Sequence, residues 1–218
     1  MLIEKKFIKY NYTNSNNRKI EYIVLHDTGN TSKGANADAH YRYFNGGNRG
    51  VSAHYFIDDV KALQIIDDKN IAWHCGKKYT STVEVTDCNN FNSIGVEVCV
   101  NEDGDLEKAI ANTIELIKFL MREYKIDLSH VITHKQATGK ECPSTLYKLG
   151  YVDRIKKELV KMDIPQWKLD ACNKFIARIG LDNTWKEKLQ DTATVSDVMI
   201  IINKALDAIE NVKIKVGE

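Results

Sequence analysis

The strongest constraint on the fold is an amphipathic helix that the sequence places between two short apolar runs. From Asp105 to Tyr124, apolar residues recur at steps of three and four, which is the spacing of one buried helix face. These apolar positions are Leu106, Ile110, Ile114, Ile117 and Met121. The runs 93–100 and 131–133 on either side are rich in β-branched residues and predict core strands. The combination implies a central sheet that is covered by helices.

Other segments up to residue 162 extend this pattern. A buried central strand is predicted over Tyr22–His26, because turn residues follow an apolar, β-branched run. The remaining expected elements are a surface loop over 1–20, a helix over 35–44, a hairpin formed by 51–57 and 62–66, a short apolar run over 71–76, a polar loop over 77–92 and a second amphipathic helix over 146–159. We therefore predict an α/β fold in which helices flank a mixed central β-sheet, in one domain over residues 1–162.

The pattern changes around Pro165 and Trp167. Beyond them no strand pattern occurs, and apolar stripes at helical spacing predict two or three short helices. About 50 residues of short helices form only a marginal core by themselves. We therefore predict a small all-α C-terminal module over residues 163–218, which docks on another surface or forms a homo-oligomer.

Charge and hydropathy argue against two classes of partner. The 218 residues have a formal net charge of +1 with lysines and acids interspersed, so no bulk attraction to nucleic acid or anionic membrane is expected. No window approaches the roughly 18 apolar residues of a membrane span. The first residues also lack the apolar core of a secretory signal. We expect a protein that is made in the cytoplasm and does not insert into membranes.

The five cysteines are expected to be reduced thiols, because they are odd in number and irregularly spaced. Cys99 and Cys172 fit the pattern of small buried hydrophobic residues. Cys75 and Cys88 flank the polar loop, and the sequence leaves their role open.

A dense group of reactive side chains follows the predicted strand 131–133. His134, Lys140 and Cys142 lie within nine residues, on what we expect to be one loop. Far upstream, His26 ends another predicted strand. Catalytic zinc takes three protein ligands from His, Cys, Asp or Glu and keeps a fourth position for water. His26, His134 and Cys142 could supply these three ligands.

Two charged residues each have two interpretations. Glu97 lies in the middle of the predicted strand 93–100, and alone it is best explained by a half-exposed strand whose carboxylate faces water. A zinc hydrolase, however, needs a proton acceptor and a group that stabilises the oxyanion, and Glu97 and Lys140 could fill these roles. Without a metal, Lys140 would be an ordinary solvated lysine. Sequence spacing alone leaves both alternatives open.

Five motifs taken together resemble a known family. They are YIVLHDTGN, VSAHYFID, IAWHCG, NSIGVEVCVN and ITHKQATGKECPS, in this order between about Tyr22 and Tyr151. The chain is similar to the type 2 N-acetylmuramoyl-L-alanine amidases, a zinc-dependent family related to peptidoglycan recognition proteins. The resemblance implies a mixed sheet with helices on its faces and a zinc ion at the floor of a groove. It also implies cleavage of the amide between the lactyl group of N-acetylmuramic acid and L-alanine.

The resemblance assigns roles to individual residues. It matches the zinc ligands to His26, His134 and Cys142, the oxyanion-stabilising lysine to Lys140, and the general base to Glu97. His74, beside Trp73, matches a groove residue and is expected to contact the substrate.

One motif departs from the family pattern. Many members have a tyrosine where this chain has His54 followed by Tyr55, so neither residue is given a catalytic role. His40 and His130 match no motif, and we expect them on a helix surface and in a loop, respectively.

The missing secretory signal favours a phage or prophage endolysin, which is made in the host cytoplasm and reaches peptidoglycan after holin-type release. The helices of residues 163–218 would then bind the cell wall or dimerise. Two alternatives remain, a non-catalytic peptidoglycan-recognition module and a phage protein that binds a host protein. A nucleobase deaminase does not fit, because the sequence lacks its His-x-Glu and Pro-Cys-x-x-Cys motifs.

Overall fold

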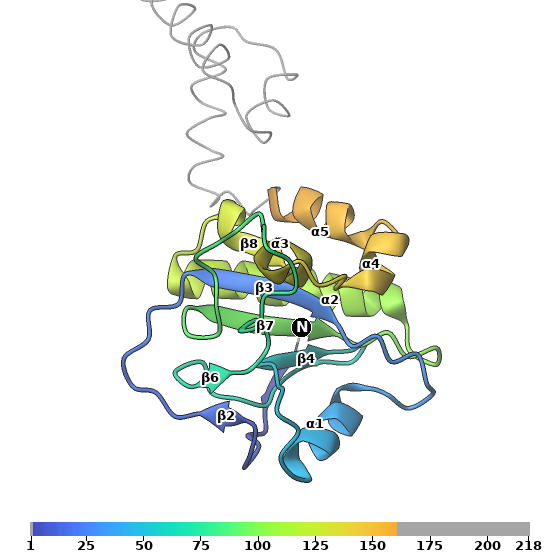
Figure 1. Ribbon diagram of the computed structural model, residues 1–218. Coiled ribbons are helices and arrows are strands. Elements are labelled where there is room, and N and C mark those ends of the chain that lie inside the picture. The colour runs from blue at the N-terminus through green and yellow to red at the C-terminus, as the bar shows by residue number, and fades with distance from the viewer. Residues whose placement is uncertain (1, 161–218) are drawn as a thin grey trace, which may run out of the picture. The chain divides into compact units, whose positions relative to one another are not determined.

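A six-stranded mixed sheet organises residues 2–160, the part of the chain that the computed structural model describes (Figure 1). Its strand order is β1-β5-β4-β7-β3-β8. Within this sheet β4 and β5 are antiparallel, and the other neighbours are parallel. The strands are β1 (Ile3–Lys5), β3 (Tyr22–Asp27), β4 (Tyr55–Ile57), β5 (Ala62–Gln64), β7 (Ser93–Val98) and β8 (Val131–Thr133), while β2 (Tyr12–Thr13) and β6 (Ile71–Ala72) form a separate antiparallel pair.

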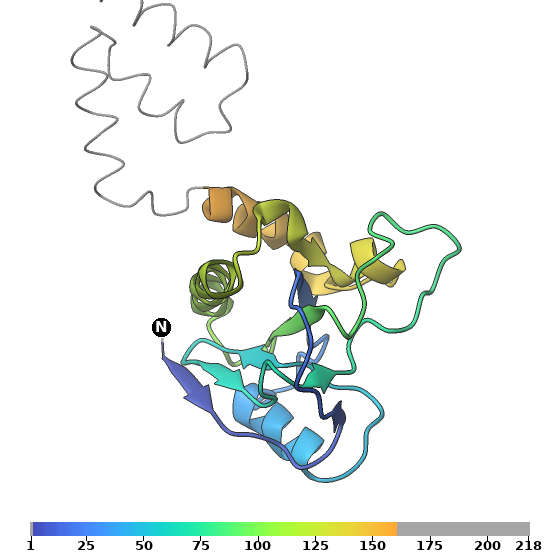
Figure 2. The same ribbon diagram turned by 90° about the vertical axis from the view of Figure 1, so that its left-hand side faces the viewer.

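Helices cover both faces of the sheet. Figures 1 and 2 show α2 and α5 on one side and α1 on the other. The helices are α1 (Ala37–Asn45), α2 (Leu106–Tyr124), α3 (His134–Thr138), α4 (Ser144–Lys148), α5 (Tyr151–Val160) and the 3-10 helix η1 (Leu128–His130). The predicted α/β fold, a mixed central sheet flanked by helices, is confirmed.

Strand β3 is buried along its whole length because both of its faces are covered. Ile23 and Leu25 pack in the core that includes residues of α2 and α5. Tyr22 and Val24 pack in a different cluster, since successive side chains of a strand point to opposite faces. This alternation puts His26 on the face of Tyr22 and Val24, as predicted.

Helix α2 is the helix that the sequence predicts most clearly. The Asp105 side chain caps it by accepting a hydrogen bond from the backbone N–H of Lys108 at 3.2 Å. Lys125, in the left-handed conformation with φ 54°, ends it. Eight residues of α2 are buried, so the apolar face predicted from the spacing lies in the core.

Three segments differ from the prediction. Residues 1–20, predicted as a surface loop, contain β1 and β2, which are too short to give a recognisable period. Of the first half of the predicted hairpin, only Tyr55–Ile57 forms a strand. The predicted helix over 146–159 is divided into α4 and α5, and Gly150, with φ +75°, lies between them. Such a φ is readily adopted only by glycine and interrupts the helix.

The all-α module predicted over residues 163–218 lies outside the described residues, and so does the homo-oligomer expected from it. The compact unit that contains the sheet ends at Leu159. A domain boundary after residue 162 stays a prediction. None of the helices within residues 2–160 is long and apolar enough to cross a membrane.

We expect Ile117→Ala to lower the free energy of unfolding by about 2–5 kcal/mol, because the buried side chain leaves a cavity in the core. Glu115→Ala, at an exposed position of the same helix, is the control and should change the stability by less than about 0.5 kcal/mol. Urea denaturation followed by circular dichroism measures both. Equal losses in the two variants would show that this face of α2 does not stabilise the core.

Candidate active site

Three parallel strands end side by side at the sheet edge where the site lies. Strand β3 runs between β7 and β8. The register pairs His26 with Glu97 and Leu25 with Thr133, and His134 comes directly after Thr133. Strand pairing therefore brings His26, Glu97 and His134 to one edge, although they are far apart in the sequence.

The sequence predicted a single loop from His134 to Cys142. This prediction is wrong, because the stretch begins with helix α3. Thr133 and Gln136 form a capping box at its start: Thr133 Oγ1 accepts a hydrogen bond from the Gln136 N–H (3.3 Å), and the Thr133 N–H donates to Gln136 Oε1 (3.0 Å). Gly139, with φ +81°, ends the helix. The T-x-x-Q pattern was the sequence signal for this helix.

The segment that carries Cys142 is anchored on both sides. On one side, the N–H of Lys135 donates a hydrogen bond to the Cys142 carbonyl (2.9 Å). On the other side, Asp27 Oδ2 accepts hydrogen bonds from the N–H groups of Thr145 (2.8 Å) and Leu146 (3.2 Å) at the start of α4. Asp27 is the last residue of β3, so the strand end itself holds this segment in place.

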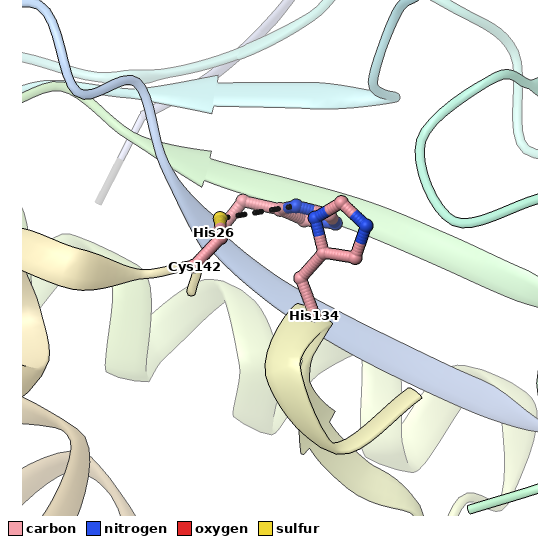
Figure 3. A group of neighbouring side chains, drawn as sticks. All are labelled: His26, His134 and Cys142. Atoms are coloured by element: carbon pink, nitrogen blue, oxygen red, sulfur yellow. Dashed lines mark hydrogen bonds between the residues drawn. The ribbon is translucent and has the colours of Figure 1, made fainter. Parts of the chain in front are cut away.

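The side chains of His26, His134 and Cys142 gather at one point (Figure 3). One potential ligand atom from each lies within 4.8 Å of the others, and Cys142 Sγ is 3.6 Å from His26 Nδ1. All three residues are buried. His134 Nδ1 is also buried, and nothing in the described part of the chain forms a hydrogen bond with it. A metal ion would give this atom the partner that it lacks.

The environment favours a metal site with neutral histidines. Burial lowers the pKa of His26 well below its usual value and that of His134 to about 4, with smaller contributions from the neighbouring histidines and Lys140. Burial also raises the pKa of the Cys142 thiol to about 12, a shift that a bound divalent cation would oppose by favouring the thiolate. Two neutral imidazoles and a thiolate fit zinc, which prefers nitrogen and sulfur ligands.

His74 lies directly behind His26. Its Nδ1 is 3.1 Å from His26 Nε2, and its Nε2 is 3.3 Å from Ser93 Oγ. Gly95 makes room for the ring, because a Cβ at this position would lie 2.7 Å from it. Metal-bound histidines are commonly oriented by such a contact at their second nitrogen. This contact with His26 was not predicted, and the substrate contact expected of His74 stays a prediction.

Glu97 and Lys140 both line the groove at this sheet edge. Glu97 Oε1 is 3.9 Å from His26 Nδ1, and the Glu97 side chain is only 19% exposed. Burial, with a smaller effect of Asp27, raises the pKa of Glu97 to about 8. Lys140 is exposed, with its Nζ 5.9 Å from the centre of the Tyr79 ring. The Glu97 carboxyl group is therefore not on a water-facing strand surface. The half-exposed strand that explained Glu97 best when it was considered alone does not occur.

The groove has a volume of about 410 Å³, which is within the usual range for ligand sites. Trp73 lines it, and so do Lys77, Tyr79 and Asn90 from the polar loop region. No helix or strand occurs over residues 77–92, as predicted. The groove thus combines a candidate zinc site with a carboxyl group and an ammonium group, which together can hydrolyse an amide.

His54 and Tyr55 do not line the groove. His54 is fully buried, and its Nδ1 accepts a hydrogen bond from the N–H of Gly95 at 3.0 Å. The Tyr55 hydroxyl donates to Asp68 at 2.8 Å. Both polar groups are thus engaged with the protein interior.

The surface position predicted for His40 is wrong. Its ring is half-buried and stacks on Phe56, with 5.0 Å between the ring centroids, because α1 packs this side against β4. His130 is exposed in η1, and its ring lies 4.5 Å from that of Tyr22.

The cysteines in the described residues are free and buried, which agrees with the expected reduced thiols. Cys75 and Cys88, whose role was open, pack with Tyr22 and Val24. Cys172 lies outside the described residues.

Comparison with known proteins agrees with this arrangement. The profile of the family described as N-acetylmuramoyl-L-alanine amidase matches residues 16–145. Among curated proteins, N-acetylmuramoyl-L-alanine amidase XlyA of Bacillus subtilis (strain 168) is 42% identical over 125 residues, or 57% of this chain and 40% of XlyA. The amidase CwlH of the same organism is 41% identical over 125 residues, or 57% of this chain and 48% of CwlH. The chain thus matches less than half the length of these curated relatives.

Two solved structures are also similar. The catalytic domain of XlyA is 38% identical with a TM-score of 0.61, and a mutant endolysin from Bacillus subtilis is 38% identical with a TM-score of 0.63. Each match covers 73% of this chain and 99% of the other chain. The shared fold therefore includes the sheet and its flanking helices.

We expect Cys142→Ser to lose bound zinc, because an alcohol is a much poorer zinc ligand than a thiolate. The loss of affinity should exceed the roughly 10–100-fold that is typical of changes outside the ligand set. Cys99→Ser, at another buried cysteine, is the matched control and should retain zinc. Zinc content per chain, measured by atomic emission, decides between them. Full zinc occupancy in Cys142→Ser would refute the ligand assignment.

Proposed function

The chain belongs to the N-acetylmuramoyl-L-alanine amidase family, and from this premise we propose that it is a zinc-dependent peptidoglycan hydrolase. The bond cleaved is the amide between N-acetylmuramic acid and L-alanine. One observation carries the proposal: three candidate zinc ligands and Glu97 line a single groove. Bacterial cell-wall peptidoglycan is the partner, with His74 as a candidate substrate contact.

When bound by His26, His134 and Cys142, zinc would supply Lewis-acid activation of a water molecule and of the amide carbonyl. Glu97 accepts a proton from the attacking water as the water oxygen bonds to the lactyl carbonyl carbon, and it gives that proton to the alanine nitrogen as the C–N bond breaks. A pKa raised to about 8 suits a group that must both take and return a proton near neutral pH. Glu97 Oε2 is buried and has no hydrogen-bond partner among residues 2–160, while Oε1 faces His26 Nδ1 at 3.9 Å.

Lys140 stabilises the negative charge that develops on the carbonyl oxygen. Lys140 lines the groove, and its charge contributes to the low pKa of both His26 and His134. The field of Lys140 therefore reaches the candidate metal site, which supports this role.

The biological setting that we propose is that of a phage or prophage endolysin. Such a protein is made in the host cytoplasm and acts on the cell wall after holin-type release. The similarity to a solved structure described as a mutant endolysin supports this setting. For residues 163–218, which lie outside the described part, we propose a module that binds the cell wall or forms a homo-oligomer.

The function is tested by digestion of isolated bacterial cell walls. We expect the purified protein to release new amino groups on L-alanine, because hydrolysis of the proposed bond frees that amine. A chelator should abolish the release, and added zinc should restore it. New reducing sugars without new amino groups would indicate a different bond, and full activity after removal of zinc would contradict the metal dependence.

Glu97→Gln should keep its zinc but lower the turnover by about 10²–10⁴-fold, because an amide cannot take the proton of water. Glu102→Gln, at an exposed carboxylate in the segment after β7, is the control and should retain turnover. Amine release and zinc content are measured on the same samples. Wild-type turnover in Glu97→Gln would remove the proton-transfer role and leave the metal assignment intact.

A further inference from the structure

Three contacts in series join His26, a candidate zinc ligand, to the polar loop over residues 77–92. His74 Nδ1 lies 3.1 Å from His26 Nε2, and His74 Nε2 lies 3.3 Å from Ser93 Oγ. Ser93 is the first residue of β7, and its hydroxyl donates a hydrogen bond to the backbone carbonyl of Asn89. Ser93 is fully buried, and His74 is buried as well. Water therefore does not compete for these contacts.

The direction of each hydrogen bond follows from the last acceptor in the series. The Asn89 carbonyl oxygen can only accept, so it takes the single hydroxyl proton of Ser93. Ser93 Oγ is then an acceptor toward His74, whose Nε2 must carry a proton. Because neither ring partner of His74 is an anion, this buried ring is neutral and has a lone pair on Nδ1. The lone pair accepts a hydrogen bond from His26 Nε2. The neutral His26 ring thus has its proton on Nε2 and a lone pair on Nδ1.

An independent observation agrees with this assignment for His26. Nδ1, the nitrogen that the series leaves without a proton, is the one that faces the candidate metal site, because Cys142 Sγ lies 3.6 Å from it (Figure 3). A histidine binds a metal ion through its unprotonated nitrogen. The tautomer that the hydrogen bonds require is therefore the one that can bind zinc at this place.

The opposite tautomer of His26 would disrupt the series. If His26 carried its proton on Nδ1, its Nε2 would have to accept from His74 Nδ1. His74 Nε2 would then have a lone pair, and it would face the lone pairs of Ser93 Oγ. The hydroxyl could donate to this nitrogen only by giving up Asn89. Either way one buried polar group would lose its partner, which is unfavourable.

One turn of the polar loop holds both ends of the His74 contacts. Asn90 Oδ1 accepts a hydrogen bond from the backbone N–H of His74 at 2.9 Å. The N–H of Asn89 donates to Asn92 Oδ1 at 2.9 Å, and the N–H of Phe91 donates to Asn89 Oδ1 at 2.8 Å. The turn therefore fixes the backbone of His74 and also the carbonyl group at which the series ends.

Building on the proposed zinc-dependent function, we propose that Ser93 is a positioning residue of the metal site, which acts through His74 to keep His26 in the tautomer that binds zinc. Ser93 itself contacts neither the metal site nor the groove. Its hydroxyl is the group that distinguishes the two tautomers, because it accepts from His74 only while it donates to Asn89. Removal of the hydroxyl should leave His74 Nε2 without an acceptor and allow both tautomers of His26.

The tautomers are measured by ¹H–¹⁵N correlation NMR of the histidine rings, on the full chain with and without zinc. We expect the wild type to carry the proton on Nε2 of both His26 and His74, also in the metal-free chain. In metal-free Ser93→Ala, part of the molecules should carry it on Nδ1 of His26. A metal-free wild type with the His26 proton on Nδ1 would overturn the inference. This spectrum needs neither zinc nor cleavage, so its result is separate from a failure of the proposed function.

Zinc affinity, measured by competition with a chromogenic chelator, is the second test. We expect Ser93→Ala to bind zinc about 10–100-fold more weakly than the wild type, and Ser93→Thr, which keeps the hydroxyl, to bind like the wild type. Cys75→Ala is the matched control, because Cys75 is buried and its Sγ lies 3.3 Å from Ser93 Oγ but outside the series. It should keep the wild-type affinity. Wild-type affinity in folded Ser93→Ala, or an equal loss in Cys75→Ala, would refute the positioning role.

Discussion

The parallel pairing of β3 with β7 and β8 is the constraint on which the rest of the structure depends. Hydrogen bonding in this register places His26 beside Glu97 and ends β8 just before His134. The pairing is stable because β3 is buried on both faces, with Ile23 and Leu25 toward α2 and the alternate residues toward the other side. A shift of one residue would turn the imidazole of His26 into the α2 core.

Long, periodic elements could be predicted from the sequence, and short ones could not. The helix α2 and the strands β3 and β7 have enough residues for their apolar spacing to be recognised. Strands β1 and β2 have three and two residues and depend on partners that are distant in the sequence. Helix α3 was missed although its T-x-x-Q capping box is written in the sequence. The polar residues of this stretch favoured the prediction of a loop over that of a short helix.

The candidate site was predictable where it depends on residue chemistry, and not where it depends on tertiary contact. His26, His134 and Cys142 are typical zinc ligands, and the structure brings them together. The place of His74 behind His26, in contrast, depends on the missing side chain of Gly95. The half-buried position of His40 likewise depends on how α1 packs on β4. Neither relation leaves a local pattern in the sequence.

The hydrogen bonds that Asp27 accepts from Thr145 and Leu146 have a consequence for how the site moves. Asp27 follows His26 directly. The end of β3 therefore carries the His26 imidazole and also binds the segment that carries the thiol of Cys142. A displacement of this strand end would carry both groups in the same direction and preserve their separation. The backbone therefore fixes the distance between the candidate ligands His26 and Cys142. Motion of the groove walls can then alter access to the site without altering this distance.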